Sequence, residues 1–283
     1  MDAAVVADVN VEAIKPKVGA VVHVDKATFL DRAFVSRCLE LIEKHTALVF
    51  PRLGLTDEEQ LAFTDSLGER INFTDSVPGG DEATKDVYTI TLDRAVNTDP
   101  EYVYGSMFWH MDGIVSDIPP PKFTLLSCHQ PPDKGGQTEF ANTYAAWEAL
   151  PDEEKAELEG LRVVHNLVAG LRGILDPDEI NPAKRKMNHE HPLVWTHESG
   201  RKSLLIGHHA DYIVGMPKPQ GRALLNRLLE WAGQPDFSCR HTWQKGDFAM
   251  WDNTGALHRA LPYSEDSGRR MHRTTVAGYE AVA

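Results

Sequence analysis

The sequence predicts a single, mainly β domain of the sandwich or jelly-roll type, with helices flanking the strands. Its 283 residues are enough for one large domain, and no linker rich in Pro, Gly or Ser separates two. From residue 122 onward, short apolar runs follow one another between Gly, Pro and Asp residues. Such a succession favours a sandwich or jelly roll over a parallel sheet with alternating helices.

The first third of the chain predicts a mixture of helices and strands. Residues 29–46 carry apolar side chains at helical spacing, and 47–51 form an apolar run typical of a short buried strand. A second helix is expected to begin at Thr56, because Glu59 stands where it completes a capping box. Residues 86–92 predict a further strand.

The remainder of the chain predicts mostly strands. Helices are expected at about 143–158 and 219–232. The segment 168–190 is charged and irregular, which is typical of a lid or an insertion beside a site. We therefore expect one domain over residues 1–283 with this segment as its variable middle. The predicted strands cover residues 122–130, 161–167, 191–198, 203–210, 238–244, 247–253 and 271–279.

Composition and charge limit the function classes. Asp and Glu outnumber Lys and Arg by 42 to 29, and the net charge of −13 argues against nucleic-acid or membrane partners. The three cysteines are widely spaced, so they predict no disulfide framework and favour a reducing cytoplasm. The N-terminus lacks the features of a signal peptide, and no apolar run approaches the roughly 18–20 residues of a membrane span.

The stretch FWHMDG, residues 108–113, places a histidine and an aspartate two positions apart. On an extended segment His110 and Asp112 would point to one side while Met111 turns away. Two ligands are too few for a catalytic metal, and the best third candidate is His258, which follows a strand and a polar turn. Two histidines and one carboxylate form the facial triad of non-haem Fe(II) oxygenases. Taken alone, the first pair also fits an ordinary strand surface.

Two further residues follow the predicted ligands in sequence order. Thr138 ends the stretch GGQT, and Arg269 lies eleven positions after His258. The Arg269 guanidinium can hold a carboxylate through two hydrogen bonds, and the Thr138 hydroxyl can donate another to the same anion. These residues predict an anion-binding site beside the metal.

The ordered set WHMD, GGQT, WDNTGALHRA and RRMHRTTVAG resembles the family of Fe(II)/2-oxoglutarate-dependent dioxygenases typified by taurine dioxygenase and 2,4-dichlorophenoxyacetate dioxygenase. The run SGRKSLLIGHHADYIVGM looks most like the aryloxyalkanoate branch. The resemblance implies a double-stranded β-helix, a distorted jelly roll with flanking helices. It also implies that His110, Asp112 and His258 bind Fe(II), and that Thr138 and Arg269 bind the far carboxylate of 2-oxoglutarate.

The same resemblance implies the reaction. O2 and 2-oxoglutarate would be consumed, succinate and CO2 released, and a small anionic organic substrate hydroxylated. Halogenating relatives carry a small residue at the carboxylate position, so Asp112 favours hydroxylation. Hydroxylation next to an ether or another C–heteroatom bond would be followed by cleavage of that bond. We also expect a homo-oligomer.

Arg273 is the candidate substrate contact. It lies four positions beyond Arg269, so both would face one way on a strand, and the family places an arginine for the substrate anion there. The alternative is an arginine paired with an acidic loop. We expect Arg70 to be a solvated arginine at a helix end rather than a second anion contact.

The residues after Gly68-Glu69 bear on the substrate class. The taurine enzymes carry a sulfonate-binding histidine shortly after this pair, and the sequence here has none, which argues against taurine. Ile71 and Phe73 instead predict an apolar pocket for an aryl or alkyl group. A carboxylate of the aryloxyalkanoate type is therefore favoured, with an organosulfonate or alkyl sulfate as the alternative.

Other polar residues are expected to have structural roles. His189 and His191 alternate in a charged segment without a third ligand, which indicates a solvated loop. Asn253 is expected to order the turn before the third predicted ligand. His208 and His209 leave two interpretations open: a contact with the site, or a strand histidine with a structural partner.

Two other function classes stand as alternatives. One is a jelly-roll protein that holds a ligand without turnover, but such a protein would need neither the metal-ligand set nor the two anion contacts. A zinc hydrolase also suits two histidines and an aspartate, but no HExxH-like motif supplies a general base. The oxygenase is the leading hypothesis.

Overall fold

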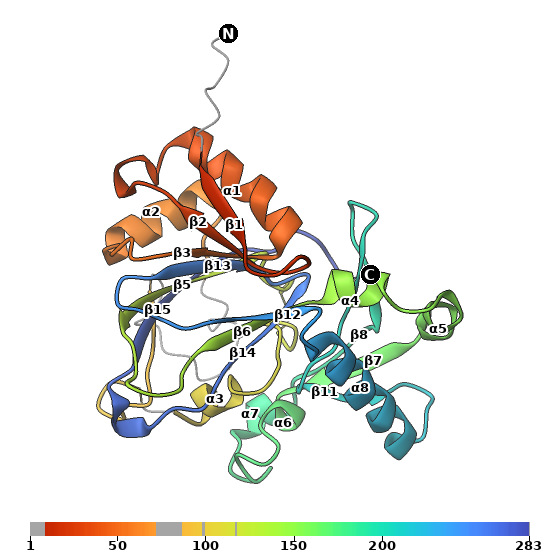
Figure 1. Ribbon diagram of the computed structural model, residues 1–283. Coiled ribbons are helices and arrows are strands. Elements are labelled where there is room, and N and C mark those ends of the chain that lie inside the picture. Colours follow the sequence, from red (N-terminus) through yellow and green to blue (C-terminus); the bar gives the residue numbers. More distant parts are fainter. Residues whose placement is uncertain (1–8, 72–86, 98–99, 117, 283) are drawn as a thin grey trace.

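The computed structural model describes residues 9–71, 87–97, 100–116 and 118–282 (Figure 1). The described part is mostly β with helices around the sheets, as predicted. Its strands are β1 (Asn10–Ala13), β2 (Ala20–His23), β3 (Ala47–Phe50), β4 (Tyr88–Ile90), β5 (Phe123–Gln130), β6 (Thr138–Asn142), β7 (Arg162–Asn166), β8 (Asn188–Pro192), β9 (Val194–Thr196), β10 (Lys202–Leu204), β11 (Ala210–Ile213), β12 (Ser238–His241), β13 (Phe248–Asp252), β14 (Ala256–Ala260) and β15 (Arg270–Val276). Its helices are α1 (Arg32–His45), α2 (Asp57–Leu67), α3 (Pro100–Gly105), α4 (Thr143–Glu148), α5 (Asp152–Leu158), α6 (Leu167–Gly170), α7 (Pro182–Arg185) and α8 (Lys218–Gly233).

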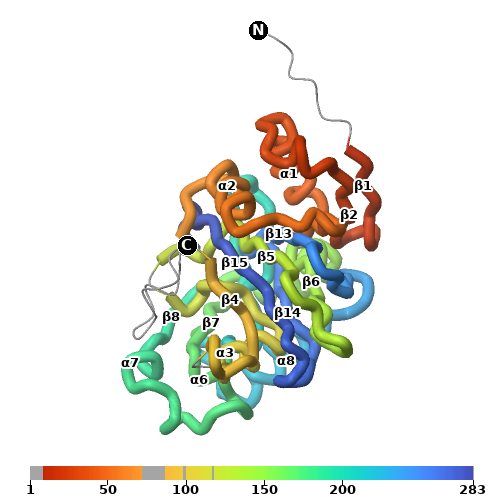
Figure 2. Tube along the Cα trace, turned by 90° about the vertical axis from the view of Figure 1, so that its left-hand side faces the viewer, coloured from red at the N-terminus to blue at the C-terminus, as the bar shows by residue number. Residues whose placement is uncertain are grey.

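The strands form one large sheet and three smaller ones. The large sheet has the order β1-β2-β3-β13-β5-β15-β4, in which β2 and β3 pair in parallel and the other neighbours are antiparallel. The three-stranded sheet β12-β6-β14 lies against one face of the large sheet, and α1 and α2 lie against the other (Figures 1 and 2). The sheet β11-β7-β8 and the hairpin of β9 and β10 lie to one side with α8.

The side chains of β13 alternate between two hydrophobic cores, one on each face of the large sheet. Phe248 and Met250 pack under α1 and α2, while Ala249 and Trp251 pack between the two facing sheets. Successive strand residues point to opposite faces, so an unbroken apolar run fits a strand that is buried on both sides. Each fully buried phenylalanine of this kind contributes roughly 1.5–3 kcal/mol to stability.

The predicted start of α2 is confirmed. Oγ1 of Thr56 accepts a hydrogen bond from the Glu59 N–H at 3.3 Å, and Glu59 Oε2 accepts one from the Thr56 N–H at 2.7 Å. This reciprocal pair is a capping box, which satisfies two backbone donors that would otherwise lack partners. Asp57 is thereby fixed as the first residue of the helix.

Three predicted elements were wrong in extent. The helix expected over 143–158 is two helices, α4 and α5, because Pro151 between them has no N–H to continue the first. The strand expected over 203–210 ends at Leu204 and resumes at Ala210, because the chain turns at Gly207, which has a φ of 150°. The strand expected over 191–198 is divided between β8 and β9.

The expected solvated loop at His189 and His191 was also wrong. Both residues lie on β8, and His191 Nε2 is 3.1 Å from the carbonyl oxygen of Ile114. The pairing of β8 with β7 brings His189 opposite His165. The charged residues of this segment suggested a solvent-exposed loop, but the pairing of β8 with β7 places both histidines in a sheet.

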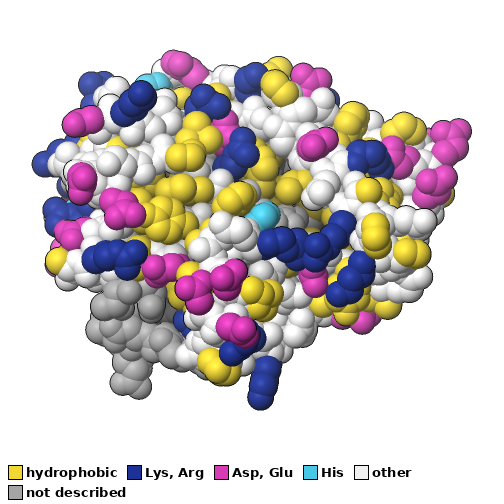
Figure 3. Space-filling view, turned by 90° about the horizontal axis from the view of Figure 1, so that it is seen from below, with side chains coloured by type: hydrophobic (Ala, Val, Ile, Leu, Met, Phe, Trp, Pro, Cys, Tyr) yellow, Lys and Arg dark blue, Asp and Glu magenta, His cyan; other side chains and the backbone are white. Residues whose placement is uncertain are grey.

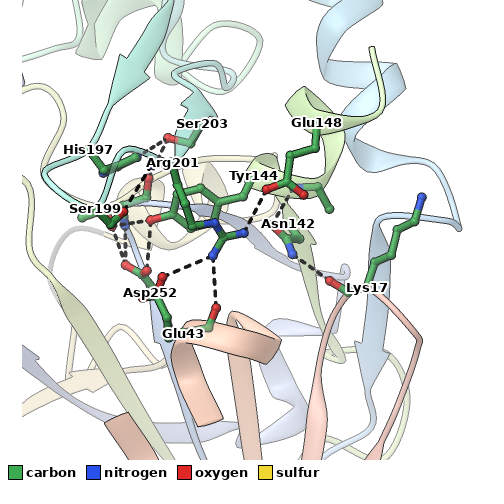
Figure 4. Close-up of polar contacts among 12 residues, drawn as sticks. Lys17, Glu43, Asn142, Tyr144, Glu148, His197, Ser199, Arg201, Ser203 and Asp252 are labelled. Carbon is green, nitrogen blue, oxygen red and sulfur yellow. Dashed lines mark hydrogen bonds and ion pairs between the residues drawn. The ribbon is translucent and has the colours of Figure 1, made fainter. Parts of the chain in front are cut away.

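Arg201 fastens the β9–β10 hairpin to the rest of the domain (Figure 4). Its guanidinium bonds Glu43 on α1 and Glu148 on α4, each at 3.3 Å, and lies 4.1 Å from the centre of the Tyr144 ring. The Tyr144 hydroxyl donates to Asp252 at the end of β13 at 3.2 Å. This network holds the β13–β14 turn in place. Within the described ranges, none of the helices has both the length and the apolar character of a membrane span.

Candidate active site

Three of the predicted site residues meet between the facing sheets. His258 lies on β14, and His110 stands opposite it in a single antiparallel bridge with backbone hydrogen bonds of 3.1 and 3.0 Å. The chain then turns at Asp112, so the segment is extended only around His110. Nε2 of His110 is 3.7 Å from Asp112 Oδ1, and Nε2 of His258 is 3.7 Å from Asp112 Oδ2. One ligand atom from each side chain lies within 4.8 Å of the other two.

The protonation states of these side chains fit a metal site. Burial alone would raise the pKa of Asp112, but His258, Arg273, His110 and a hydrogen bond from Thr124 lower it to about 2. Burial, followed by the neighbouring His110, lowers the pKa of His258 well below its usual value. The site therefore offers a carboxylate and a neutral imidazole, which are the forms that bind metals.

His110 is also oriented for coordination. Its Nδ1 lies 2.8 Å from the carbonyl oxygen of Phe108, a distance at which Nδ1–H donates to that oxygen. Such a bond leaves the Nε2 lone pair free to face the cavity. Two histidines and one carboxylate on one side of a cavity suit non-haem Fe(II), with positions left open for other ligands.

A chain of hydrogen bonds fixes the Asp112 carboxylate. Thr124 on β5 donates to Asp112 Oδ2 at 2.8 Å and accepts from Asn253 Nδ2 at 2.5 Å. Oδ1 of Asn253 accepts from Trp251 Nε1 at 3.0 Å, and all four side chains are buried. Sequence reasoning missed Thr124, whose only signal was its place on the predicted strand 122–130.

Thr138 and Arg269 both line the cavity that holds the three predicted metal ligands. Both are buried, and within the described part of the chain Nε of Arg269 has no hydrogen-bond partner. The Thr138 hydroxyl accepts from Trp243 Nε1 at 2.9 Å, so its own proton is available to an acceptor in the cavity. A buried guanidinium with an unpaired N–H is costly, and a carboxylate would satisfy it.

The two glycines of GGQT allow this arrangement. Gly135 and Gly136 have φ values of 78° and 66°, which glycine adopts without strain. A Cβ on Gly135 would lie 2.0 Å from the Pro262 carbonyl oxygen, and one on Gly136 would lie 3.1 Å from the Arg269 side chain. Gly135 therefore lets the chain pass close to the backbone of Pro262, and Gly136 lets it pass close to the Arg269 side chain.

Arg273 lines the same cavity as Arg269. Its Nη1 lies 3.8 Å from Asp112 Oδ1, and its guanidinium lies 4.9 Å from the centre of the Tyr88 ring. Ile71 instead bonds the Thr275 carbonyl through its N–H at 3.0 Å, and it is not among the residues that line this cavity. Phe73 lies outside the described residues. Arg70 bonds Asp65 at 2.7 Å, as expected of an arginine at a helix end.

His208 and His209 both contact the segment that carries His110. Nε2 of His209 accepts from the Met111 N–H at 3.1 Å, while Nδ1 of His209 lies 2.8 Å from Nδ1 of His165. The His208 ring stacks on Phe108 with centroids 4.2 Å apart. These contacts support the turn between the ligands, so the two histidines have structural partners close to the site.

Apolar and cationic groups share the cavity lining. Figure 3 shows the molecule from below, where hydrophobic side chains lie beside basic and acidic ones. The cavity itself combines the apolar Ile90 and Leu126 with the guanidinium groups of Arg259 and Arg269. An anion with an apolar body would be complementary to such a surface. The lining comprises Ile90, Ser106, His110, Asp112, Leu126, Thr138, Trp251, His258, Arg259, Ala260, Arg269 and Arg273.

Comparisons with known proteins agree with the site. The family described as taurine catabolism dioxygenase TauD, TfdA family matches residues 10–275. The alpha-ketoglutarate-dependent 2,4-dichlorophenoxyacetate dioxygenase of Burkholderia sp. (strain RASC) is 35% identical over 250 residues, covering 84% of this chain and 83% of that protein. An alkylsulfatase of Acinetobacter baylyi is 30% identical over 259 residues, covering 88% of this chain and 78% of that protein.

Solved structures lead to the same conclusion. The crystal structure of AAD-2 in complex with Mn(II) and N-oxalylglycine superposes with a TM-score of 0.81 at 32% identity, covering 97% of this chain and 99% of that one. The family predicted from the ordered motifs is thus confirmed. The chain belongs to the taurine catabolism dioxygenase TauD, TfdA family and is a 2-oxoglutarate-dependent non-haem iron dioxygenase.

Proposed function

We propose that the enzyme hydroxylates a small anionic organic molecule, with an aryloxyalkanoate-like carboxylate favoured. The observation that carries this proposal is the placement of Arg273, whose Nη1 lies 3.8 Å from Asp112 Oδ1 in a cavity that the apolar Ile90 and Leu126 also line. A substrate anion held by Arg273 would bring the neighbouring carbon of the substrate beside the metal. Hydroxylation there, next to an ether oxygen, would lead to cleavage of the C–O bond.

The residues divide between three tasks. His110, Asp112 and His258 would hold Fe(II), which with bound 2-oxoglutarate supplies the activation of O2 and releases succinate and CO2. Thr138 and Arg269 would grip the far carboxylate of 2-oxoglutarate through charge-assisted hydrogen bonds. The chain itself supplies binding, orientation and exclusion of water.

The apolar part of the substrate would lie against hydrophobic side chains. Ile90 and Leu126 line the cavity, and Phe108 exposes 39% of its surface beside His110 while it stacks on His208. An aromatic ring can stack on such a surface, which favours an aryl group. An alkyl sulfate or organosulfonate is the second candidate, because an alkylsulfatase is among the relatives.

We infer that the facing sheets form a double-stranded β-helix and that the chain is one catalytic domain. The antiparallel order of β13, β5 and β15 opposite β12, β6 and β14 supports this inference. The segment 168–190 would act as a lid or insertion beside the site. In support, the Arg172 carbonyl lies 3.4 Å from His208 Nε2, and Leu171 lies next to Gly105 at the end of α3.

An anaerobic binding experiment tests the iron and 2-oxoglutarate sites. Fe(II) and 2-oxoglutarate together should give a weak visible charge-transfer band, which should disappear in His110→Ala. His23→Ala, on the exposed end of β2, is the matched control and should keep the band. A wild-type protein with no band under these conditions would contradict the assignment.

A substrate panel tests the substrate class. Aryloxyalkanoates, alkyl sulfates, sulfonates and amino acids would be compared by succinate release under air. Aryloxyalkanoates should give the highest kcat/KM. Preference for an alkyl sulfate or sulfonate would replace the favoured substrate with the second candidate, and the absence of succinate with every anion would contradict the proposed substrate class.

A further inference from the structure

A second group of two histidines and one aspartate lies on the opposite face of the large sheet from the iron site. Asp57 is the first residue of α2, His129 is near the end of β5, and His272 is on β15. Along β15, Met271 packs in the inner core and Arg273 lines the active-site cavity. His272 stands between them and therefore points to the opposite face of the sheet, where its Nδ1 contacts Asp57 on α2.

The donor atoms of this cluster converge. Nδ1 of His272 is 2.7 Å from Asp57 Oδ1, and Nε2 of His129 is 3.6 Å from the same oxygen. One ligand atom from each residue lies within 4.8 Å of the other two. Zinc bonds of roughly 2.0–2.2 Å place the ligands of a tetrahedral ion roughly 3.3–3.6 Å apart, so small side-chain movements would bring all three onto one ion.

The strand pairing places His129 for this role. Met271 pairs with Cys128 while Arg270 pairs with Gln130, so His129 is the extra residue of a β-bulge. Bulges redirect side chains, and they are common next to functional sites. Here the His129 ring stacks on the His272 ring, with centroids 3.7 Å apart and planes at 23°.

The surroundings hold the ligands but leave room for water. The side chains of Asp57, His129 and His272 are 41%, 27% and 15% exposed, so the site opens to solvent on one side. Gln60 Nε2 donates to the His272 carbonyl at 3.1 Å, and the capping box fixes the helix end that carries Asp57. Partners of this kind reduce the freedom that ligands lose on binding a metal.

We propose that Asp57, His129 and His272 form a second metal site, which binds Zn²⁺ with water completing the tetrahedral coordination. Two imidazoles and one carboxylate are ligands that zinc accepts, and the open position suits a water molecule. The ion would join α2 to β5 and β15. Because β15 also carries Arg273, zinc would stabilise the strand that forms one wall of the iron site.

Zinc titration of metal-free protein by calorimetry tests this proposal. An iron-site variant, His110→Ala with His258→Ala, should bind one zinc per chain, and the addition of His129→Gln should abolish that binding. Asp57→Asn in the same background should also abolish it. His23→Gln is the control, because His23 lies 3.7 Å from a single carboxylate, that of Glu12, and its loss should leave the zinc bound.

Thermal unfolding gives a second readout. Zinc at 100 times its Kd should raise the Tm of the iron-site variant by about 5 °C and should leave the Tm of the variant with His129→Gln unchanged. The proposal is overturned if the folded iron-site variant binds no zinc, or if His129→Gln and Asp57→Asn leave binding intact. The cluster would then be a hydrogen-bonded pair with a stacked neighbour. Neither result depends on turnover, so the failure of this proposal is distinct from failure of the oxygenase assignment.

Discussion

Thr124 orients Asp112: its hydroxyl donates a 2.8 Å hydrogen bond to Oδ2 of this carboxylate, which is buried beside two histidines. The same hydroxyl accepts from Asn253, so the bond has a fixed direction. The carboxylate thus has its orientation before any metal arrives. Asp112 therefore loses its conformational freedom when the protein folds, and little further freedom is lost when the metal binds.

Thr124→Val removes this bond with little change of shape and should weaken metal binding. Loss of such a supporting hydrogen bond typically lowers metal affinity about 10- to 100-fold. Anaerobic titration with Fe(II) or Mn(II) measures the effect. The control is Thr275→Val, the same change at the position paired with Thr124 on β15. Equal affinities in the two variants would show that Thr124 does not support the ligand.

Arg269→Ala should raise the KM for 2-oxoglutarate with little change in the KM for the primary substrate. A hydrogen bond to a charged group is worth roughly 1.5–3 kcal/mol, which corresponds to roughly 10- to 150-fold. Arg270→Ala is the matched control, because the next residue is exposed. An unchanged 2-oxoglutarate requirement in Arg269→Ala would refute the assignment.

Arg273→Ala should raise the KM for the anionic substrate and leave the affinity for 2-oxoglutarate nearly unchanged. A loss of roughly 10-fold or more in kcat/KM is expected from one charged contact. Arg70→Ala serves as control, because Arg70 bonds Asp65. If Arg273→Ala instead lowers the Tm and affects both substrates alike, the arginine has a structural role.

Acid should destabilise the protein partly through His165. Burial, with His191 and His189 nearby, lowers the pKa of His165 from 6.5 to about 3. Between those pH values the unfolded chain binds a proton that the folded chain does not. The contribution of His165 is therefore fully present above pH 6.5 and decreases as the pH falls, by about 1.4 kcal/mol per pH unit.

Urea unfolding of metal-free wild type and His165→Gln at several pH values between 6.5 and 4 measures this term. The free energy of unfolding of His165→Gln should fall less steeply with decreasing pH, whatever its value at neutral pH. His23→Gln, at an exposed position, should follow the wild-type slope. Parallel curves for wild type and His165→Gln would exclude His165 as the source.

Much of the fold followed from local sequence. The capping box at Thr56 and Glu59 fixes the start of α2 because its two hydrogen bonds lie within four residues. The apolar run at residues 247–253 predicted β13, because a short unbroken apolar run is typical of a strand that is buried on both faces. The prediction was wrong at residues 143–158, where Pro151 separates two helices. It was also wrong at His191, which pairs with β7 as part of β8 although the segment is charged.

The candidate site, like the fold, could be predicted in part from the sequence. The sequence by itself determined the kinds of residue available and their order: His110 and Asp112, then Thr138, His258 and Arg269. It could not determine that Thr124 orients Asp112, because that contact depends on how β5 lies against the turn after His110.

Only the tertiary structure decided which distant groups became neighbours. Asp57 and His272 are 215 positions apart, yet the packing of α2 on β15 brings them within 2.7 Å, and a bulge in β5 adds His129. The physical reason is that periodicity specifies the face on which a side chain lies, while strand register and packing between elements specify what lies opposite.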